Sequence, residues 1–350
     1  MRPESRIKTM ANFTGTNADE IITPEFVSST ITAIGGTQPS NAADVINAGG
    51  GNDTIDSGGG NDTVIGGTGN DVAHLGPGND LFIWNPGDGS DVVEGGTGFD
   101  TLDFVGANAD ENITISANGE RALFFRNVGN VTMDLDGIER IQFEAKGGVD
   151  NIVVNDLSKT DVKQVAIDLA AIPGSNVGDH QPDTATVNGT AGNDNIKISS
   201  DGASVVVEGL SAQVTITGAD PDKDTLIVKG GDGNDVINAS SLEGGQIKLV
   251  IDGGAGNNEL FGSQGNDTFV VTAGESGRDM IHNFQAHGAG TQGDVVELTG
   301  FSDHTFDQAV ADGHISQQGA NVVISDGTNV VATLQHVSLT SLHANDFLFT

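Results

Sequence analysis

Hydrophobic residues recur at a nine-residue spacing between residues 39 and 103. The pattern is most regular in residues 48–56, 57–65 and 66–74, where a glycine-rich stretch and an Asp precede three residues whose central one is apolar. Glycine allows the positive φ angles of a tight turn, and alternation of apolar residues is typical of a strand. Each nine-residue unit therefore predicts one turn and one short strand whose apolar residue faces a core.

The same unit continues on both sides of this centre. Residues 75–83 repeat it, Trp84 and Asn85 interrupt it, and residues 86–94 and 95–103 resume it. Residues 39–47 form a weaker first copy, and a degenerate copy lies at residues 15–22. We expect the degenerate copy to cap the array rather than to bind a ligand.

Beyond residue 103 the strict period is lost, and fragments of the unit return at residues 145–152, 189–196 and 230–237. Between them, short alternating runs predict strands separated by turns; examples are residues 205–207, 214–217, 225–228 and 247–251. Two architectures fit such strands, an appended β-sandwich or a solenoid with longer coils. We favour the solenoid because the fragments between the strands repeat the same turn and strand.

Composition and charge narrow the chemistry. The chain of 350 residues has 14 Lys and Arg against 49 Asp and Glu, a net charge of −35, and it has no Cys. Such acidity repels nucleic acid, and the lack of Cys excludes disulfides, thiolate zinc sites and a Cys nucleophile. No apolar run approaches the roughly 20 residues that cross a bilayer. Carboxylate and carbonyl chemistry remains, and it favours hard cations.

The nine-residue unit matches the pattern GGxGxDxUx, where U is a large apolar residue, and with it the chain resembles the RTX, or haemolysin-type calcium-binding, repeat family. The resemblance implies an all-β fold, a parallel β-roll or β-solenoid with calcium-binding GGxGxD turns and an irregular β-rich middle section. It also implies that two units form one coil, so that equivalent residues stack 18 apart. On that basis one wall holds Ile46, Val64 and Phe82, and the other holds Ile55 and Ala73.

The aspartates stack by the same spacing, with Asp44, Asp62 and Asp80 along one edge and Asp53 and Asp71 along the other, and Asp91 and Asp100 continue the columns after the insertion. Like charges in a column repel each other. Calcium removes this conflict because it accepts roughly six to eight oxygen ligands at flexible angles. Metal-free turns are the alternative, since Gly, Asn and Asp also form hairpin turns unaided. Repetition in register favours several calcium ions.

The predicted calcium ligands are the turn aspartates, together with the glycines at the second and fourth positions of the regular units. In the array they are Asp44, Gly49, Gly51, Asp53, Gly58, Gly60, Asp62, Gly67, Gly69, Asp71, Gly76, Gly78, Asp80, Gly87, Gly89, Asp91, Gly96, Gly98 and Asp100, and beyond it they are Asp150, Asp194, Asp235 and Asp267. Asn258 replaces the Asp in residues 253–260. Because an amide is a weaker ligand than a carboxylate, we expect that loop to bind calcium weakly or not at all.

These patterns divide the chain into five segments. They are an N-terminal cap or extension at residues 1–38, the calcium-binding β-roll at 39–103, an irregular solenoid or sandwich at 104–188, a second solenoid section at 189–275, and a C-terminal cap with a secretion signal at 276–350.

The last six residues, an acidic residue followed by apolar ones, are similar to the uncleaved signal of type I secretion, through which many RTX proteins leave the cell. An ordinary last strand is the alternative. The N-terminus shows no apolar leader of signal-peptide length. We therefore expect an extracellular or cell-surface bacterial protein whose partners are calcium and the type I secretion apparatus, with no nucleic acid and no membrane insertion.

Catalytic motifs are not apparent in the sequence. It contains no HExxH, no GxSxG and none of the Tyr that repeat-bearing mannuronan epimerases use. We predict a non-enzymatic calcium-binding protein of the cell surface or matrix that folds on calcium outside the cell and self-associates. The alternative is a calcium-dependent protein that binds or modifies polysaccharide. Trp84 could then stack on a sugar, and the other interpretation of Trp84 is a residue that covers the core. Asp62→Ala or Asp71→Ala is expected to raise the calcium needed for folding, and Asp303→Ala is not.

Overall fold

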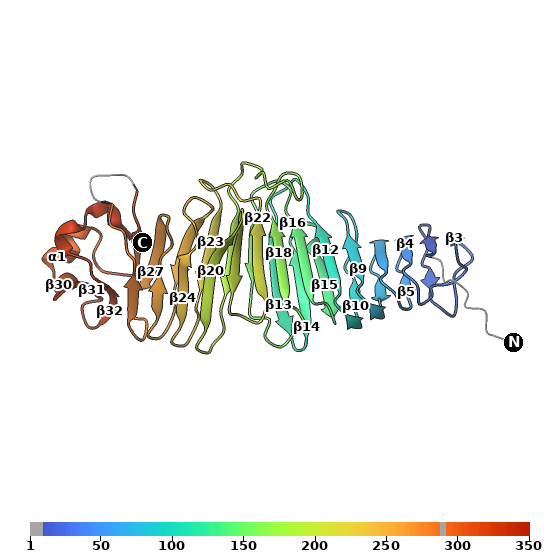
Figure 1. The fold of residues 1–350 in the computed structure, drawn as a ribbon, viewed down its shortest axis with the longest axis horizontal. Helices are drawn as coiled ribbons and strands as arrows, with labels where there is room; N and C mark the ends of the chain where they lie inside the picture. Colours follow the sequence, from blue (N-terminus) through green and yellow to red (C-terminus); the bar gives the residue numbers. More distant parts are fainter. Residues whose placement is uncertain (1–9, 288–291) are drawn as a thin grey trace. The chain divides into compact units, whose positions relative to one another are not determined.

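The computed structural model describes residues 10–287 and 292–350, which form a nearly all-β fold (Figure 1). The described chain divides into two compact units. One extends up to Asp150 and includes Leu157–Asp168, and the other consists of Asn151–Asp156 and Leu169–Thr350. Within each unit, short strands alternate between two sheets, and most neighbouring strands pair in parallel. The predicted all-β, mostly parallel fold is confirmed.

The first unit contains the regular nine-residue array. Its first sheet consists of β1 (Asn12–Thr14), β3 (Thr32–Ile34), β4 (Val45–Gly50), β6 (Thr63–Thr68), β9 (Leu81–Trp84), β12 (Thr101–Val105), β16 (Arg140–Glu144) and β18 (Gln164–Asp168). Its second sheet consists of β2 (Ile21–Ile22), β5 (Thr54–Asp56), β7 (Val72–His74), β10 (Val92–Glu94), β13 (Asn112–Asn118), β14 (Arg121–Arg126) and β15 (Val131–Asp136). Two short strands, β8 (Pro77–Gly78) and β11 (Thr97–Gly98), pair with each other, and η1 (Val128–Asn130) is a 3₁₀ turn.

The strand register confirms the 18-residue stacking. Ile46 pairs with Val64 and Val64 with Phe82 in the first sheet, and Ile55 pairs with Ala73 in the second. All five side chains are completely buried. Because the side chains of a strand alternate between faces, one apolar residue per unit is enough to build each wall of this narrow core.

Aromatic residues fill the core after the insertion. Trp84 is fully buried and stacks on Phe104 with ring centroids 4.0 Å apart, while its Nε1 donates to the carbonyl of Gly89 at 2.8 Å. Phe104 in turn contacts Phe124 at 4.2 Å. Trp84 therefore covers the interior, as one of the two sequence interpretations held, and it presents no exposed ring to a sugar.

An antiparallel meander interrupts the parallel coils of this unit. β13 pairs with β14, and β14 with β15, before β15 rejoins the parallel sheet beside β10. β14 brings two arginines to acidic side chains. Arg121 contacts Glu94 at 2.7 Å and Asp134 at 2.5 Å, and Arg126 contacts Glu111.

The second unit repeats the two-sheet plan with longer coils. One sheet is parallel throughout and contains β17 (Asn151–Val154), β19 (Thr184–Asn188), β23 (Thr225–Lys229), β25 (Lys248–Asp252), β27 (Asp267–Thr272), β29 (Val295–Thr299) and β33 (Phe347–Phe349). The parallel order favours the predicted solenoid over a sandwich. The last six residues, which the sequence predicts to be either a secretion signal or a last strand, include β33. This strand pairs with β29.

The other sheet of this unit mixes parallel coils with antiparallel hairpins. It contains β20 (Asn195–Asp201), β21 (Ser204–Glu208), β22 (Gln213–Thr217), β24 (Val236–Ser241), β26 (Glu259–Phe261), β28 (Asp279–His282), β30 (Ile315–Gln318), β31 (Asn321–Ser325) and β32 (Val330–Leu334). Helix α1 (Phe306–Ala311) and the 3₁₀ turns η2 (Leu339–Ser341) and η3 (Ala344–Asp346) lie near the C-terminus. None of the helices in the described chain has the length and hydropathy needed to cross a membrane.

Candidate metal sites

Two columns of buried carboxylates follow the turns of the first unit. Each Asp directly precedes a strand, and its side chain accepts a hydrogen bond from the backbone of the preceding coil. The column beside the first sheet joins Asp44 N–H to Asp62 Oδ1 (2.7 Å), Asp62 N–H to Asp80 Oδ1 (2.7 Å) and Asp80 N–H to Asp100 Oδ1 (2.8 Å). The column beside the second sheet joins Asp53 N–H to Asp71 Oδ1 (2.7 Å) and Asp71 N–H to Asp91 Oδ1 (2.9 Å). We call these columns the carboxylate ladders.

The ladders confirm the predicted stacking and extend beyond it. The links to Asp91 and Asp100 span 20 residues instead of 18, because the coil that they close contains the inserted Trp84 and Asn85. Glu20 begins one ladder, since its N–H donates to Asp53 Oδ1 at 2.7 Å. Glu139 ends the other, where its Oε2 accepts from the N–H of Asp100 at 2.7 Å. The degenerate copy at residues 15–22 thus supplies a ladder carboxylate, Glu20.

The second carboxylate oxygen tests whether these turns fit a cation. In the ladders it is Oδ2, and this atom is buried without a hydrogen-bond partner in Asp53, Asp62, Asp71, Asp80, Asp91 and Asp100. Each of these side chains is at most 2% exposed. A buried acceptor left unpaired costs roughly 1–3 kcal/mol, and more when it is charged. A stack of such atoms fits the coordination of a hard cation.

The electrostatics of the ladders agree with this fit. Burial raises the pKa of Asp53, Asp80 and Asp91 to about 7, and that of Asp71 and Asp100 to about 6. The cause is that a buried carboxylate loses the water that solvates its charge. Backbone hydrogen bonds lower the pKa again, but they replace only part of the lost solvation. Without a positive charge beside them, these five aspartates would therefore hold protons near neutral pH.

Backbone carbonyl oxygens complete the set of potential ligands. A Cβ atom on Gly69 would lie 1.7 Å from the carbonyl oxygen of Gly51, and one on Gly78 would lie 1.5 Å from that of Gly60. Only glycine permits so close an approach between successive turns. In the described part of the chain, no three Asp, Glu or His side chains gather into a cluster that could hold a metal. Each turn instead presents one carboxylate beside carbonyl oxygens, which are ligands that calcium prefers.

In one turn of the first unit, the side chain of Arg126 neutralises the carboxylate of Glu111. Glu111 is fully buried, and its N–H donates to Asp150 Oδ1 at 2.8 Å, as in a ladder. Its Oε2 accepts from the N–H of Ala107 at 3.0 Å, and its Oε1 accepts from Nε of Arg126, which is 4% exposed. Both oxygens of Glu111 are therefore satisfied, and the residues at this turn do not fit an additional metal ion.

The second unit has shorter ladders. Asp183 N–H donates to Asp224 Oδ1 at 2.9 Å, and Asp194 N–H donates to Asp235 Oδ1 at 2.8 Å. Oδ2 of Asp235 is again buried without a partner. The ladder continues through Asn258, whose Oδ1 accepts from the N–H of Asp235 at 2.9 Å.

The amide of Asn258 closes its own turn. Since its Oδ1 accepts a hydrogen bond, its Nδ2 is the donor, and it reaches the carbonyl of Gly254 at 3.1 Å and Oδ1 of Asp279 at 2.8 Å. This N–H group supplies the positive partner that a cation would otherwise provide. The contacts support the expectation that this loop binds calcium weakly or not at all.

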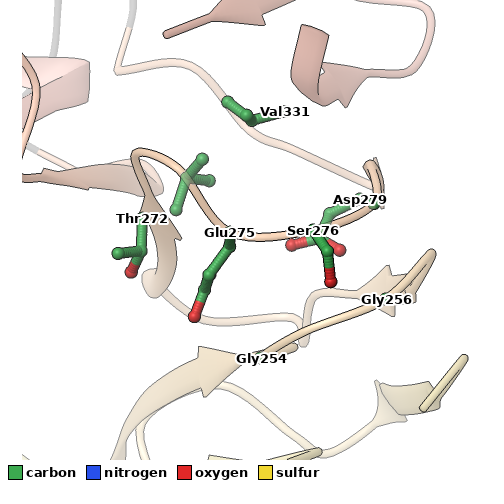
Figure 2. Close-up of a pocket in the computed structure, with 9 residues that line it drawn as sticks. Gly254, Gly256, Thr272, Glu275, Ser276, Asp279 and Val331 are labelled. Atoms are coloured by element: carbon green, nitrogen blue, oxygen red, sulfur yellow. The ribbon is translucent and has the colours of Figure 1, made fainter. Parts of the chain in front are cut away.

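Figure 2 shows the cavity beside this turn. Glu275, Ser276 and Asp279 from one turn line it together with Gly254 and Gly256 from the preceding turn. Its volume is about 10 Å³, near the minimum that holds one water molecule. The cavity therefore has no room for an organic ligand.

The structure separates the predicted residues into groups. It places Asp53, Asp62, Asp71, Asp80, Asp91, Asp100 and Asp235 in turns whose second carboxylate oxygen has no partner, and it places Asp44, Asp194 and Asp267 in turns where that oxygen accepts a backbone N–H. Asp150 pairs with Glu111. The binding of calcium by each of these residues remains a prediction.

Sequence reasoning missed several ladder members. Glu20 and Glu111 escaped because they carry Glu where the pattern expects Asp. Asp279 was missed because its turn is incomplete. Residues 274–278 keep the glycines at the first and fourth positions of the pattern, Gly274 and Gly277, but have Glu275 at the second position. Asp224 follows a segment that lacks glycine near it, so no local signal could have found it.

These observations define the class of protein: a parallel β-roll whose turns are built to hold calcium. The family model of the RTX calcium-binding nonapeptide repeat (4 copies) matches residues 40–73, 58–83, 86–103, 227–241 and 250–281. The chain therefore contains RTX calcium-binding nonapeptide repeats in several copies, and calcium is the ligand that these repeats imply.

Two further comparisons complete this result. The crystal structure of the extracellular lipase LipA from Serratia marcescens is similar over 88% of this chain and 40% of that chain, with 17% sequence identity and a TM-score of 0.32. The chain thus spans about two fifths of the length of that lipase, and similarity at this level gives no information about activity. The comparison with curated proteins found no match.

Proposed function

We propose that this chain is a secreted, non-enzymatic calcium-binding protein that folds when it meets calcium outside the cell and then serves as a self-associating component of the cell surface or matrix. The observation that carries the proposal is the set of ladder aspartates with a buried, unpartnered Oδ2. Proteins with RTX repeats are typically secreted, which supports the extracellular location. The type I route rests on the C-terminal sequence pattern alone.

Calcium acts as a folding switch in this proposal. The net charge of −35 favours an expanded chain, and the ladders bring carboxylates together only in the folded coils. Calcium supplies the positive charge when bound, so the free energy of binding becomes free energy of folding. At a concentration about 10-fold above the dissociation constant, each site would add about 1.4 kcal/mol. Extracellular modules bind calcium at roughly 0.1–1 mM, which suits this switch.

A calcium titration of the chelator-treated protein tests the switch. Circular dichroism follows the strands, and the fluorescence of Trp84, the sole Trp, follows burial in the first unit. We expect both signals to appear together near millimolar calcium and to vanish with chelator. A protein that is fully folded in chelator and indifferent to calcium would contradict the proposal. Light scattering over the same titration tests self-association, and a monomer at every calcium concentration would contradict the matrix role.

One groove favours the second candidate, calcium-dependent polysaccharide binding or modification. It lies in the second unit, has a volume of about 360 Å³, and is lined by carboxylate, amide and ammonium side chains that can bind sugar hydroxyls. These are Asp222, Glu243, Lys248, Gln264, Asn266 and Gln292. Pull-down on a panel of polysaccharides with and without calcium separates the candidates. Saturable binding that is lost in Glu243→Gln would favour the second one.

A further inference from the structure

The residue four positions before each ladder carboxylate divides the turns into two kinds. Where Oδ2 has no partner, that residue has a positive φ. The residues are Gly49, Gly58, Gly67, Gly76, Gly87, Gly96 and Gly231, with φ between 87° and 110°, and they precede Asp53, Asp62, Asp71, Asp80, Asp91, Asp100 and Asp235. We call these the open turns. Lys146, four residues before Asp150, also has a positive φ, of 67°.

In five other turns, the same residue donates its backbone N–H to the second carboxylate oxygen, and its φ is not positive. The pairs are Ser40 with Asp44 (2.9 Å), Ala107 with Glu111 (3.0 Å), Thr190 with Asp194 (2.6 Å), Asp220 with Asp224 (2.7 Å) and Ser263 with Asp267 (2.6 Å). We call these the closed turns. Glu20 lies between the two kinds: Thr16, whose φ is not positive, donates its N–H to Oε1 at 3.3 Å, while Oε2 is buried without a partner.

Backbone conformation explains the division. With a positive φ the N–H turns away from the following carboxylate, as at Gly58, whose N–H donates to Oδ1 of Asp56 at 3.0 Å. Ser and Thr disfavour a positive φ, and their hydroxyls stabilise the closed conformation. Thr190 Oγ1 lies 3.1 Å from Asp194 Oδ1, and Ser263 Oγ lies 2.7 Å from Asp267 Oδ1. In a closed turn, two donors therefore occupy the carboxylate that a cation would need.

We propose that this residue decides which turns take calcium: a positive φ leaves the carboxylate open to the ion, and a backbone N–H closes it. Asp53, Asp62, Asp71, Asp80, Asp91, Asp100 and Asp235 then bind calcium. Asp44, Asp194 and Asp267 do not, although the sequence pattern predicts all of them as ligands. The inference rests on the proposed function, because it assumes that the repeats bind calcium.

Thr190→Gly tests the inference by gain of a site. The substitution removes the hydroxyl and permits a positive φ in a turn that otherwise matches the repeat, with Gly189, Gly192 and Asp194 in place. Thr190→Ala is the matched control, because alanine loses the hydroxyl but still disfavours a positive φ and keeps its N–H. Native mass spectrometry of the full chain counts bound calcium. We expect Thr190→Gly to bind one ion more than the wild type, and Thr190→Ala to bind the same number.

Gly87→Ser tests the opposite direction. A Cβ at Gly87 meets no atom within 4 Å, so the substitution changes backbone preference without a clash. We expect this variant to bind one calcium ion fewer, with circular dichroism showing that it remains folded. The inference would be overturned if Thr190→Gly and Gly87→Ser both bind as many calcium ions as the wild type, or if Thr190→Ala gains an ion. A wild type that binds no calcium would instead overturn the proposed function, so the two failures are distinguishable.

Discussion

The guanidinium carbon of Arg126 lies 5.3 Å from the centroid of the Trp84 ring, while Nε of the same side chain pairs with buried Glu111. The charge that neutralises Glu111 therefore also contacts the sole Trp of the chain. This contact makes the internal cation observable by fluorescence. In the turn of Glu111 the neutralising charge is the protein's own Arg126. In the open turns we propose that calcium supplies this charge.

Arg126→Met should strongly destabilise the first unit. It leaves Glu111, which is 0% exposed, as a buried charge without a partner, and such losses cost about 3–5 kcal/mol. Denaturant unfolding at saturating calcium, followed by Trp84 fluorescence, measures the effect. Lys197→Met is the matched control, since Lys197 and Glu208 are 55% and 43% exposed and pair at 3.9 Å, so its loss should cost less than about 1 kcal/mol. Equal effects of the two variants would contradict the assigned role of Arg126.

Asp62→Ala should raise the calcium concentration at the folding midpoint, because it removes one open carboxylate and one ladder hydrogen bond. Circular dichroism during a calcium titration measures the shift. The structure changes the choice of control: Asp303 is 2% exposed and pairs with His314 at 2.5 Å, so its removal affects stability for another reason. The exposed Asp161 is the better control, and an equal shift in Asp161→Ala would argue against a specific site at Asp62.

Acid should partly replace calcium. The pKa of Asp53, Asp80 and Asp91 rises to about 7 in the folded chain, above the ordinary value of 3.8. A carboxyl group with a raised pKa stabilises the folded form fully below its unfolded pKa, and this contribution disappears as the pH rises through the folded value. In chelator, the β-sheet signal should therefore be greater at pH 5 than at pH 8. The same signal at both pH values would show that the ladders do not control folding.

Calcium binding should also release protons near neutral pH, since the ion displaces them from carboxyl groups whose pKa lies at about 6 or 7. Calorimetric titration at pH 7 in buffers of different ionisation enthalpy measures this release. At pH 9 the groups are already ionised, and the buffer dependence should vanish. A persistent buffer dependence at pH 9 would assign the protons to other groups.

Gly69→Ala should disrupt the first unit more than Gly87→Ala does. Both glycines have positive φ, 131° and 110°, so alanine is strained at each position. Only at Gly69 would the added Cβ lie 1.7 Å from a carbonyl oxygen of the preceding coil, that of Gly51, whereas at Gly87 it meets no atom within 4 Å. The difference in unfolding free energy between the two variants isolates the close approach of successive turns. Equal losses would show that backbone strain alone sets the cost.

The sequence alone determines the regular part of the roll. The turn and the strand of each unit in residues 39–103 repeat at a fixed separation. Together with the two units per coil that the family resemblance implies, this period predicts the pairing of Ile46 with Val64 and of Asp62 with Asp80. The ligand chemistry follows as well, because one Asp per glycine-rich turn is a local pattern. The insertion at Trp84 and Asn85 lengthens the spacing of two links without breaking the ladders.

Only the tertiary structure decides how each carboxylate is satisfied. Arg126 reaches Glu111 because β13 and β14 form a hairpin that returns the chain to the turn. Asp224 joins Asp183 across 41 residues, and the amide of Asn258 contacts Asp279 across 21. These contacts depend on coil lengths that vary from one coil to the next, and on backbone angles that place an N–H toward or away from a carboxylate. The nine-residue pattern does not record coil length. It does show Ser40 before Asp44 where Gly58 precedes Asp62, but only the folded chain shows that the N–H of Ser40 reaches Asp44 while that of Gly58 donates to Asp56 instead.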